Sequence, residues 1–402
     1  MFKKRCAAVA GFLAVLVCSG MVASAYELPS ENHNTVADGH AAGKTTAAES
    51  VDLNLGGKSI ILLEEKTGRV LYERDADLQM PPASITKIMT LLLTMEAMES
   101  GRFSLTTLVT CSEHAASMGG AQIWLEAGEQ MSVDDLLKAV CIKSANDAAV
   151  ALAELVDGSE EAFVAHMNRR AKQLGMTGTV FQNASGLDAE GHVSTARDIA
   201  AMSRALMRHD KIFEYTRIWM DSLRNGRTEL VNTNRLIRFY PGATGLKTGT
   251  TDGAGSCLSA TAVRNGLSLI GVVMGFENSK TRNAAAKKLL DFGFANWRLL
   301  TPEPCPDIPK TIRISRGTVP ETEISVGDIP PILLEKNREG SLTQSLTLQT
   351  ELQAPVQQGQ ELGRVEIFVD GQPQGAYLLT AARSVPKISY IYMLLQLLRT
   401  VF

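Results

Sequence analysis

Apolar and polar residues follow two different periods along the first half of the chain. Apolar runs at residues 59–63 and 70–73, joined by a turn at 65–68, predict a β-hairpin. A longer apolar run from Ile88 to Met98 predicts a helix that is buried on most of its surface. A short extended segment at 105–110 and a short helix at 112–118 are predicted next. A central block without any strand signal follows, and its predicted helices are residues 133–142, 147–156, 160–174 and 196–207.

Strand patterns return near residue 245 and are followed by one more helix. Residues 245–250, 256–263 and 267–276 are strand-like, and the Asn-Gly pair at 265–266 is a strong hairpin signal. A helical period follows at residues 280–292. Because strands come first and last, we expect an α/β (α+β) domain. Its early hairpin and late strands form one antiparallel sheet, covered by helices and flanked by a helical subdomain.

The pattern changes after a cluster of prolines at residues 302, 304, 306 and 309, which marks a boundary. Alternating apolar and polar residues beyond it predict a separate small all-β domain, with a hairpin turn at Asp370-Gly371. The predicted strands of this domain are residues 311–315, 332–335, 342–352, 364–369 and 376–379.

The last segment, residues 386–402, has a helical period. Its polar face gathers Ser389, Gln396 and Thr400, and apolar residues cover the rest. About 15 helical residues reach only about 22 Å, which is shorter than the roughly 30 Å hydrocarbon core of a bilayer. We therefore expect the helix to lie in a membrane interface rather than to span the membrane. Docking against the β domain is the alternative.

The N-terminal residues have the pattern of a signal peptide. Basic residues at 3–5 precede an apolar stretch that ends in a small-x-small pattern at 23–25. Cys18 would suit a lipoprotein, but Val17 before it is larger than lipidation favours. Small and polar residues then predict a flexible leader. The predicted parts are a signal peptide at 1–25, a leader at 26–51, the main domain at 52–300, the small β domain at 301–384 and an amphipathic membrane-anchor helix at 385–402.

Composition limits the chemistry that this chain can perform. The 402 residues are 45% hydrophobic and 21% charged, which is typical of globular proteins. The formal net charge of −3 gives no indication of the excess positive charge that nucleic-acid binding requires. The cysteines that remain after signal cleavage are scattered singly, so we expect buried thiols, with one disulfide as the alternative. No residues have metal-ligand spacing, and we expect neither a metal nor another cofactor. The remaining cysteines are Cys111, Cys141, Cys257 and Cys305.

Three short motifs carry candidate chemistry. Ser84 and Lys87, at the start of the first long helix, share a helix face as residues i and i+3, so they can form a nucleophile and base pair. A Ser-x-Asn motif at 144–146 lies between two predicted helices, and a Lys-Thr-Gly motif at 247–249 lies on a predicted strand. The three motifs follow one another in order, each on an element that can hold its residues in place.

Each motif also has a second copy with an ordinary explanation. The second Ser-x-Asn, residues 30–32, lies in the predicted leader, and the second Lys-Thr-Gly, residues 66–68, lies in a hairpin turn. The second Ser-x-x-Lys, residues 384–387, contains Pro386, which indicates the cap and first turn of the terminal helix. Order and context therefore favour the first set.

At these residues the chain resembles the low-molecular-weight penicillin-binding proteins, the serine D-alanyl-D-alanine carboxypeptidases. The resemblance covers about residues 52–300 and extends loosely to the β domain and terminal helix, which are similar to that family's stalk and membrane anchor. The segments that carry it are residues 82–90, 144–149, 181–188 and 245–251.

The resemblance implies a penicillin-binding/β-lactamase-like fold and an enzyme of the bacterial cell wall. The expected reaction removes the terminal D-alanine from the pentapeptide stems of peptidoglycan through an acyl-enzyme, and β-lactams are the expected inhibitors. The expected location is extracytoplasmic, on the outer face of the cytoplasmic membrane, to which the C-terminal helix attaches the protein.

The resemblance also implies catalytic roles. Ser84 attacks the carbonyl between the two D-alanines, and Lys87 acts as its base. Ser144 relays the proton to the departing D-alanine, and Asn146 orients Lys87 and the substrate amide. The backbone N–H groups of Ser84 and Thr250 form the oxyanion hole.

The strand motif is expected to bind the substrate. Lys247 supplies a positive charge to the terminal carboxylate, and the Thr248 and Thr250 hydroxyls donate beside it. Gly249 allows the strand and the substrate backbone to approach closely. Arg282 is a further candidate for carboxylate binding.

Other functions remain as alternatives. A class A-like β-lactamase would use the same motifs, but it should also carry a Glu-x-x-Leu-Asn segment between Ser144 and Lys247, and none is present. DD-endopeptidase or transpeptidase activity and a silent penicillin-binding scaffold are the others. His192 is expected to be structural, and Cys141 is expected to be a packing residue.

Overall fold

A computed structural model describes residues 52–336 and 342–401 of the chain. The predicted signal peptide, the predicted leader and the second Ser-x-Asn motif lie outside the described residues. The predictions made for them therefore stay predictions.

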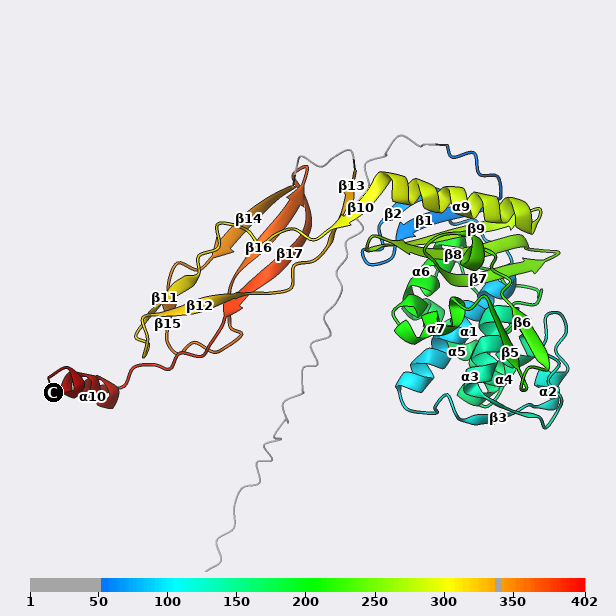
Figure 1. Cartoon of the computed structure of the whole chain (residues 1–402), viewed down its shortest axis with the longest axis horizontal. Coiled ribbons are helices and arrows are strands. Elements are labelled where there is room, and N and C mark those ends of the chain that lie inside the picture. The colour runs from blue at the N-terminus through cyan, green and yellow to red at the C-terminus, as the bar shows by residue number, and fades with distance from the viewer. Residues whose placement is uncertain (1–51, 337–341, 402) are drawn as a thin grey trace, which may run out of the picture. The chain divides into compact units, whose positions relative to one another are not determined.

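A five-stranded antiparallel sheet organises the main domain, as predicted (Figure 1). The early hairpin and the late strands form it together in the order β2-β1-β9-β8-β7. Asn265 and Gly266 form the turn between β8 and β9 with φ values of 50° and 80°, the left-handed conformation that a two-residue hairpin requires. The strands are β1 (Ser59–Glu64), β2 (Val70–Arg74), β7 (Ala243–Thr251), β8 (Gly255–Arg264) and β9 (Leu267–Phe276).

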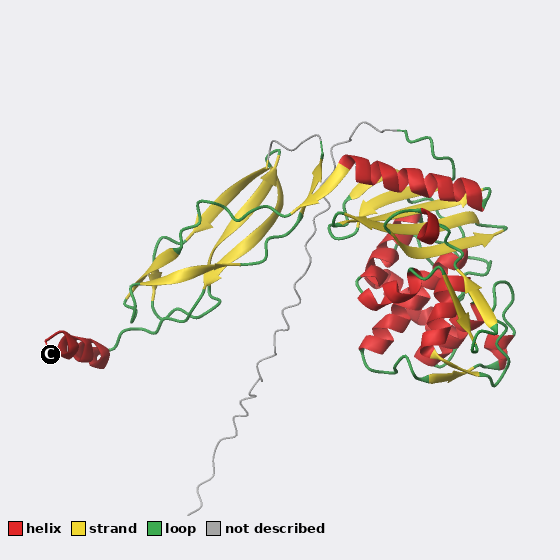
Figure 2. Ribbon diagram, viewed as in Figure 1, coloured by secondary structure: helices red, strands yellow, loops and turns green. Residues whose placement is uncertain are grey.

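The sheet has a hydrophobic core on each face. On one face, Leu62 and Leu258 pack with Leu289 of helix α9 (Ser279–Asn296). On the other face, Ile61 and Val272 join the core of the helical subdomain. Figure 2 shows α9 along one face of the sheet and the long helices of the subdomain on the opposite face. All residues of β1 are buried, which explains why its sequence is a continuous apolar run instead of an alternating one.

Helix α1 (Lys87–Glu99) runs through the centre of the subdomain, and its run from Lys87 to Met95 is wholly buried. A helix that is apolar around its circumference is buried around its circumference, in agreement with its unbroken apolar run. The other predicted helices of the block are present as α3 (Val133–Lys138), α4 (Asn146–Asp157), α5 (Glu160–Gln173) and α6 (Ala196–Met207).

The predicted helix at 133–142 is not regular. Helix α3 ends at Lys138 and continues as a π-helical turn, η2 (Ala139–Lys143), after which Ser144 has a left-handed φ of 66°. An apolar period reports which residues are buried and does not distinguish an α turn from a π turn, so the sequence did not predict this feature. π turns are often found at functional sites.

The sequence also did not predict several short elements around the subdomain. A hairpin lies between residues 220 and 231, and another pair of strands precedes α3. These strands are too short for a period-2 pattern to stand out. The unpredicted strands are β4 (Gln130–Ser132), which pairs with β3 (Leu108–Thr110), and β5 (Met220–Leu223) with β6 (Thr228–Val231); the unpredicted short helices are α7 (Phe213–Thr216) and α8 (Leu236–Phe239). Strand β3 and helix α2 (Glu113–Ala116) agree with the extended segment predicted at 105–110 and the helix predicted at 112–118.

The chain beyond the prolines forms an all-β domain, as predicted. Its six-stranded sheet has the order β14-β16-β17-β12-β11-β15, and β13 (Ile332–Glu335) pairs with β10 (Trp297–Leu300). The strand predicted at 342–352 is two strands, and one strand was not predicted, β12 (Glu321–Val326). The others are β11 (Thr311–Ser315), β14 (Leu342–Leu348), β15 (Leu352–Gln353), β16 (Glu361–Val369) and β17 (Gln372–Ala381).

The prediction that residues 384–387 cap and begin the terminal helix is wrong. The Ser384 hydroxyl accepts a hydrogen bond from the backbone of Gln358 at 2.9 Å, and Val385 is buried and bridged to Val356. The segment is therefore extended along the β domain, a conformation that suits Pro386 and the residue before it. The terminal helix α10 (Tyr390–Val401) begins later. Within residues 52–336 and 342–401, no helix is long and apolar enough to cross a membrane.

Candidate active site

The nucleophile candidate lies on a strained turn. Ser84 is half-buried in the 3-10 helix η1 (Ala83–Thr86), and Ala83 before it has a φ of 50°, which is unfavourable for a residue with a side chain. Two glycines from other segments of the chain pack closely against the backbone of this turn. A Cβ added to Gly186 would lie 1.9 Å from the Ala83 carbonyl oxygen, and one added to Gly249 would lie 3.0 Å from the Ser84 nitrogen. Only glycine fits at these two positions.

Lys87 is completely buried and contacts three neutral acceptors. Its Nζ lies 3.1 Å from Ser84 Oγ, 2.6 Å from Asn146 Oδ1 and 2.5 Å from the Ser185 carbonyl oxygen. Burial holds its pKa well below the usual value of 10.5, and the positive charge of Lys247 lowers the pKa further. The predicted base therefore meets the nucleophile in a site that favours a neutral amine.

Asn146 and Ser144 belong to the junction between the π turn and α4. The backbone N–H of Asn146 donates to Ala121 O at 2.7 Å, and its side-chain Nδ2 donates to Gly119 O at 2.6 Å. These two bonds fix the side-chain amide so that its oxygen faces Lys87. The next residue, Asp147, is buried and accepts from the backbone of the same 119–125 loop.

Lys247 lies in the middle of β7 and is also completely buried. Its Nζ donates to Ser144 Oγ at 2.6 Å and to the Thr248 carbonyl at 2.9 Å. Burial lowers its pKa to about 7, and the nearby charge of Arg282 acts in the same direction. The Thr248 hydroxyl lies 2.8 Å from that of Thr233.

The structure thus brings the three motifs together. Ser84, Lys87 and Asn146 form one hydrogen-bonded group, Ser144 and Lys247 form a second, and Gly249 packs directly against the Ser84 backbone. Thr250 is exposed on the adjoining end of β7, and its hydroxyl donates to the Gly249 carbonyl. This arrangement offers a nucleophile, a base and a buried cation for a substrate that carries an anionic end.

Sequence reasoning missed the contributions of three residues to this site. The Ser185 carbonyl is a partner of Lys87, and the Asn183 side chain shapes its turn by accepting from the Gly186 backbone at 2.6 Å. An Asn followed by a glycine within three residues was the available signal. Thr233 was missed because the hairpin that leads to it was not predicted.

Cys141 and Arg282 lie outside the three motifs, and both are buried. Cys141 is a buried free thiol, as are the other three cysteines after residue 52, and burial raises its pKa to about 12. Arg282 is buried, and it donates to Asn283 and to the Cys257 carbonyl. Its charge reaches Lys247, but among the described residues no hydrogen bond joins the two.

His192 forms two hydrogen bonds that hold neighbouring segments together, which fits the structural role expected for it. Its Nδ1 accepts from the Gln182 backbone at 3.0 Å, so its Nε2 carries the hydrogen and donates to Thr86 Oγ1 at 2.8 Å. The ring is buried, and burial lowers its pKa from the ordinary 6.5 to about 4. The neutral ring braces the turn that follows Ser84.

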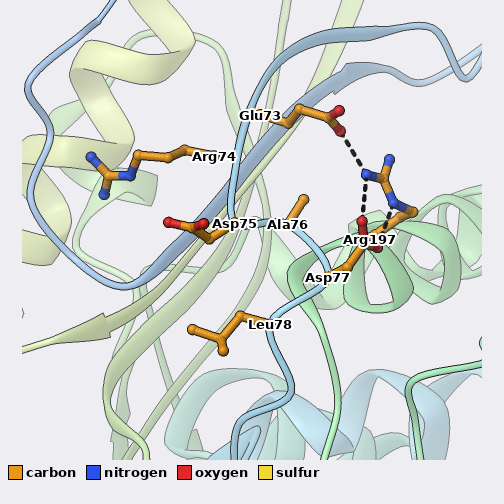
Figure 3. A pocket seen from close by; sticks show the side chains of 7 residues that line it. All are labelled: Glu73, Arg74, Asp75, Ala76, Asp77, Leu78 and Arg197. Carbon is orange, nitrogen blue, oxygen red and sulfur yellow. Dashed lines mark hydrogen bonds and ion pairs between the residues drawn. The ribbon is translucent and has the colours of Figure 1, made fainter.

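A separate hollow of about 550 Å³ lies after β2 (Figure 3). Arg197 crosses it and pairs with Glu73 at 2.8 Å and with Asp77 at 2.7 Å. Its lining contains no buried amine or serine, so it lacks the groups for acyl transfer. The lining residues are Glu73, Arg74, Asp75, Ala76, Asp77, Leu78 and Arg197.

Two family profiles match this chain. The profile of the D-alanyl-D-alanine carboxypeptidase family matches residues 44–278, and that of the penicillin-binding protein 5 C-terminal domain matches residues 307–387. D-alanyl-D-alanine carboxypeptidase DacF of Bacillus subtilis (strain 168) is 40% identical over 341 residues, which covers 84% of this chain and 88% of the relative.

Solved structures give the same result. Penicillin-binding protein 5 from Haemophilus influenzae aligns with a TM-score of 0.69 at 29% identity, over 83% of this chain and 98% of that one. Penicillin-binding protein D2 from Listeria monocytogenes, in an ampicillin-bound form, aligns with a TM-score of 0.56 at 34% identity, over 60% of this chain and 99% of that one.

The low pKa of His192 predicts a pH-dependent stability. Between pH 6.5 and about 4 the unfolded chain protonates this histidine and the folded chain does not, so the free energy of unfolding should fall as the pH falls, by roughly 3 kcal/mol in total. Denaturant titrations of the wild type and of His192→Gln at several pH values measure this difference. The variant should lose this part of the slope, whereas His114→Gln, whose half-exposed side chain lies beside Glu160, should keep it. Equal slopes in wild type and His192→Gln would contradict the assignment.

Proposed function

Because the chain belongs to the serine D-alanyl-D-alanine carboxypeptidase family, we propose that Ser84 attacks the carbonyl carbon between the two terminal D-alanines of a peptidoglycan stem. The bond from Ser84 Oγ to this carbon forms, and the peptide bond to the last D-alanine breaks. Water then hydrolyses the ester and releases the shortened stem. The hydrogen bond between Ser84 Oγ and Lys87 Nζ carries this proposal.

Lys87 is the proposed base. A neutral amine has two N–H donors and one lone pair. The donors suit the Asn146 amide oxygen at 2.6 Å and the Ser185 carbonyl at 2.5 Å, which leaves the lone pair for the Ser84 hydroxyl. Proton transfer of this kind contributes roughly 10²–10⁴ in rate.

Ser144 is the proposed relay to the leaving group. Its hydroxyl oxygen accepts from Lys247 at 2.6 Å, so its own O–H remains to be donated. The nitrogen of the departing D-alanine is the proposed acceptor of this proton. Lys87 then passes the proton that it took from Ser84 to the Ser144 oxygen, so that Lys87 and Ser144 both return to their starting protonation states. The left-handed backbone of Ser144 at the end of the π turn supports this role, because that conformation turns the residue out of the helix.

Lys247, Thr248 and Thr250 are the proposed binding groups for the terminal carboxylate. Lys87 is proposed to be neutral and to act as the base, whereas Lys247 is proposed to be protonated and to bind the carboxylate. A neutral Lys87 and a protonated Lys247 repel each other less than two cations would. The proposed oxyanion hole consists of the backbone N–H groups of Ser84 and Thr250. Support comes from Gly249, whose missing side chain leaves room beside the Ser84 nitrogen.

The proposed substrates are the pentapeptide stems of peptidoglycan, and the proposed inhibitors are β-lactams. A β-lactam ring presents a strained amide and a carboxylate at a spacing like that of the dipeptide. The ampicillin-bound form of the Listeria relative supports this part of the proposal by similarity.

The proposed location is the outer face of the cytoplasmic membrane. Helix α10 is about 18 Å long at 1.5 Å per residue, too short to span a bilayer. It nevertheless exposes several large apolar side chains, which would insert into the interface between head groups and acyl chains. These are Tyr390, Ile391, Met393, Leu397 and Leu398.

Penicillin acylation tests the assignment of the nucleophile. The folded protein should gain one penicilloyl group on Ser84, and Ser84→Ala should gain none while keeping its fold. Intact-mass and peptide mass spectrometry measure the adduct, and release of D-alanine from a pentapeptide measures turnover. Second-motif Ser384→Ala is the matched control and should behave as wild type. Acylation of the Ser84→Ala variant would refute the mechanism.

The two buried lysines predict the pH profile of kcat/KM. Above about pH 7, Lys247 of the free enzyme loses the proton that binds the carboxylate, so kcat/KM should decline on the alkaline side. Lys247→Arg keeps a cation at higher pH and should shift this decline upward by more than one pH unit, even if the maximum rate is lower. Lys280→Arg, on the first turn of α9, is the control. An unchanged alkaline limb in Lys247→Arg would rule out Lys247 as its source.

Removal of residues 390–402 tests the membrane anchor. This truncation leaves the bridge between Val385 and Val356 intact, so the β domain should stay folded. The truncated protein should appear in the soluble fraction and keep its activity on soluble pentapeptide. The fractionation is done on protein whose signal peptide has been cleaved. Continued sedimentation with membranes would overturn the role of α10.

A further inference from the structure

Trp124 combines two unfavourable features in one residue. Its side chain is 71% exposed, and its backbone has a φ of 54°, in the left-handed region that favours glycine. Its neighbours Ile123 and Leu125 are 1% and 4% exposed, so the loop is well packed on both sides of it. Among the described residues, no aromatic or cation contact to the indole is present that would explain this conformation.

The backbone around Trp124 is held from two sides. From inside, the Asp147 carboxylate accepts from the N–H groups of Ile123 and Leu125, each at 3.1 Å. From outside, the Arg224 guanidinium donates to the Ile123 carbonyl at 2.8 Å and to the Trp124 carbonyl at 3.3 Å, and it also forms an ion pair with Glu129. Strain is retained where surrounding contacts over-determine the backbone, and such positions cluster at functional sites.

This loop is a wall of the active site. Gly119 and Ala121 bind Asn146, and a Cβ on Gly120 would lie 2.9 Å from the Asn146 amide nitrogen. Trp124 follows three residues later, so its Cα lies within about 11 Å of that of Ala121. The exposed indole therefore belongs to the rim of the active site that this loop forms beside Asn146.

We propose that Trp124 determines specificity by packing its ring against the sugar attached to the stem peptide. This inference rests on the proposed function. A pyranose presents flat C–H faces, and a rigid tryptophan offers a large apolar surface with little rotamer entropy to lose. Carboxylates of the stem are repelled by the negative face of the indole ring. An ammonium group of the stem would be attracted to the same face, and such a contact would appear as equal losses on substrates with and without sugars. Contacts with such remote parts of a substrate contribute to turnover at the reacting bond.

The test compares two substrates in matched variants. Trp124→Ala should lower kcat/KM by about tenfold on a disaccharide-pentapeptide and by less than about twofold on the same pentapeptide without sugars. Trp124→Phe should recover most of the loss because it keeps a ring. Leu108→Ala, which removes another exposed apolar side chain from β3, should change neither value. Acylation of Ser84 by 6-aminopenicillanic acid, which has no sugar and no acyl side chain, should be unaffected in every variant.

Each outcome decides one point. Equal losses on both substrates, or no loss on either, would overturn the sugar contact. Absence of acylation in the wild type would instead refute the proposed function. Trp124→Gly guards against misfolding, because glycine accepts the left-handed φ without strain. Its melting temperature should equal or exceed that of Trp124→Ala, while its preference for the disaccharide substrate should be lost to the same extent.

Discussion

Two amines buried in one site, with no carboxylate of the described residues bonded to either, are the constraint on which this structure depends. Lys87 and Lys247 are both fully buried, and their hydrogen-bond acceptors are hydroxyl, amide and carbonyl oxygens. A carboxylate partner would fix the positive charge of a lysine, whereas neutral acceptors allow its proton to leave. Asp147, an acid whose charge acts on Lys87, accepts instead from backbone N–H groups. Burial therefore produces a base from one lysine and leaves the other to meet the substrate's charge.

The backbone around these amines is held in conformations that ordinary packing would not choose. Ala83 and Ser144 have φ values of 50° and 66°, one immediately before the nucleophile and one at the proposed relay. Gly186, in a loop, and Gly249, in β7, both pack closely against the backbone of the turn at Ala83. The sheet is rigid because both of its faces are covered, and it is this rigidity that keeps β7 against η1. The large cores of the domain thus stabilise a small strained region where the chemistry takes place.

The sequence predicted those features that depend on local period or on turn chemistry. The five strands of the main sheet, the Asn265-Gly266 hairpin and the long helices belong to this class. The meeting of Ser84, Lys87, Asn146 and Lys247 was expected for another reason, the order of their motifs and the resemblance to a known family. Contacts between distant segments that no motif marks were not predicted. The Ser185 carbonyl reaches Lys87 across 98 positions of chain, and a backbone acceptor leaves no trace in residue type. The error at Ser384 has the same origin, because pairing with residues 356–358 outcompetes a local helix start that the sequence alone allows.

Neighbouring residues on the first turn of α4 connect chemistry with recognition. Asn146 faces the base, while Asp147, one position later, faces the loop that carries Trp124. Successive residues of a helix point about 100° apart, so the first turn of α4 can orient a catalytic amide and anchor the 119–125 loop at the same time. Any displacement of this turn would move both groups together. Because the loop and the catalytic amide are fixed to the same turn, the loop can bind a distant part of the substrate while the scissile bond stays aligned with Ser84. This alignment is required if binding energy from a remote group is to increase the rate of bond cleavage.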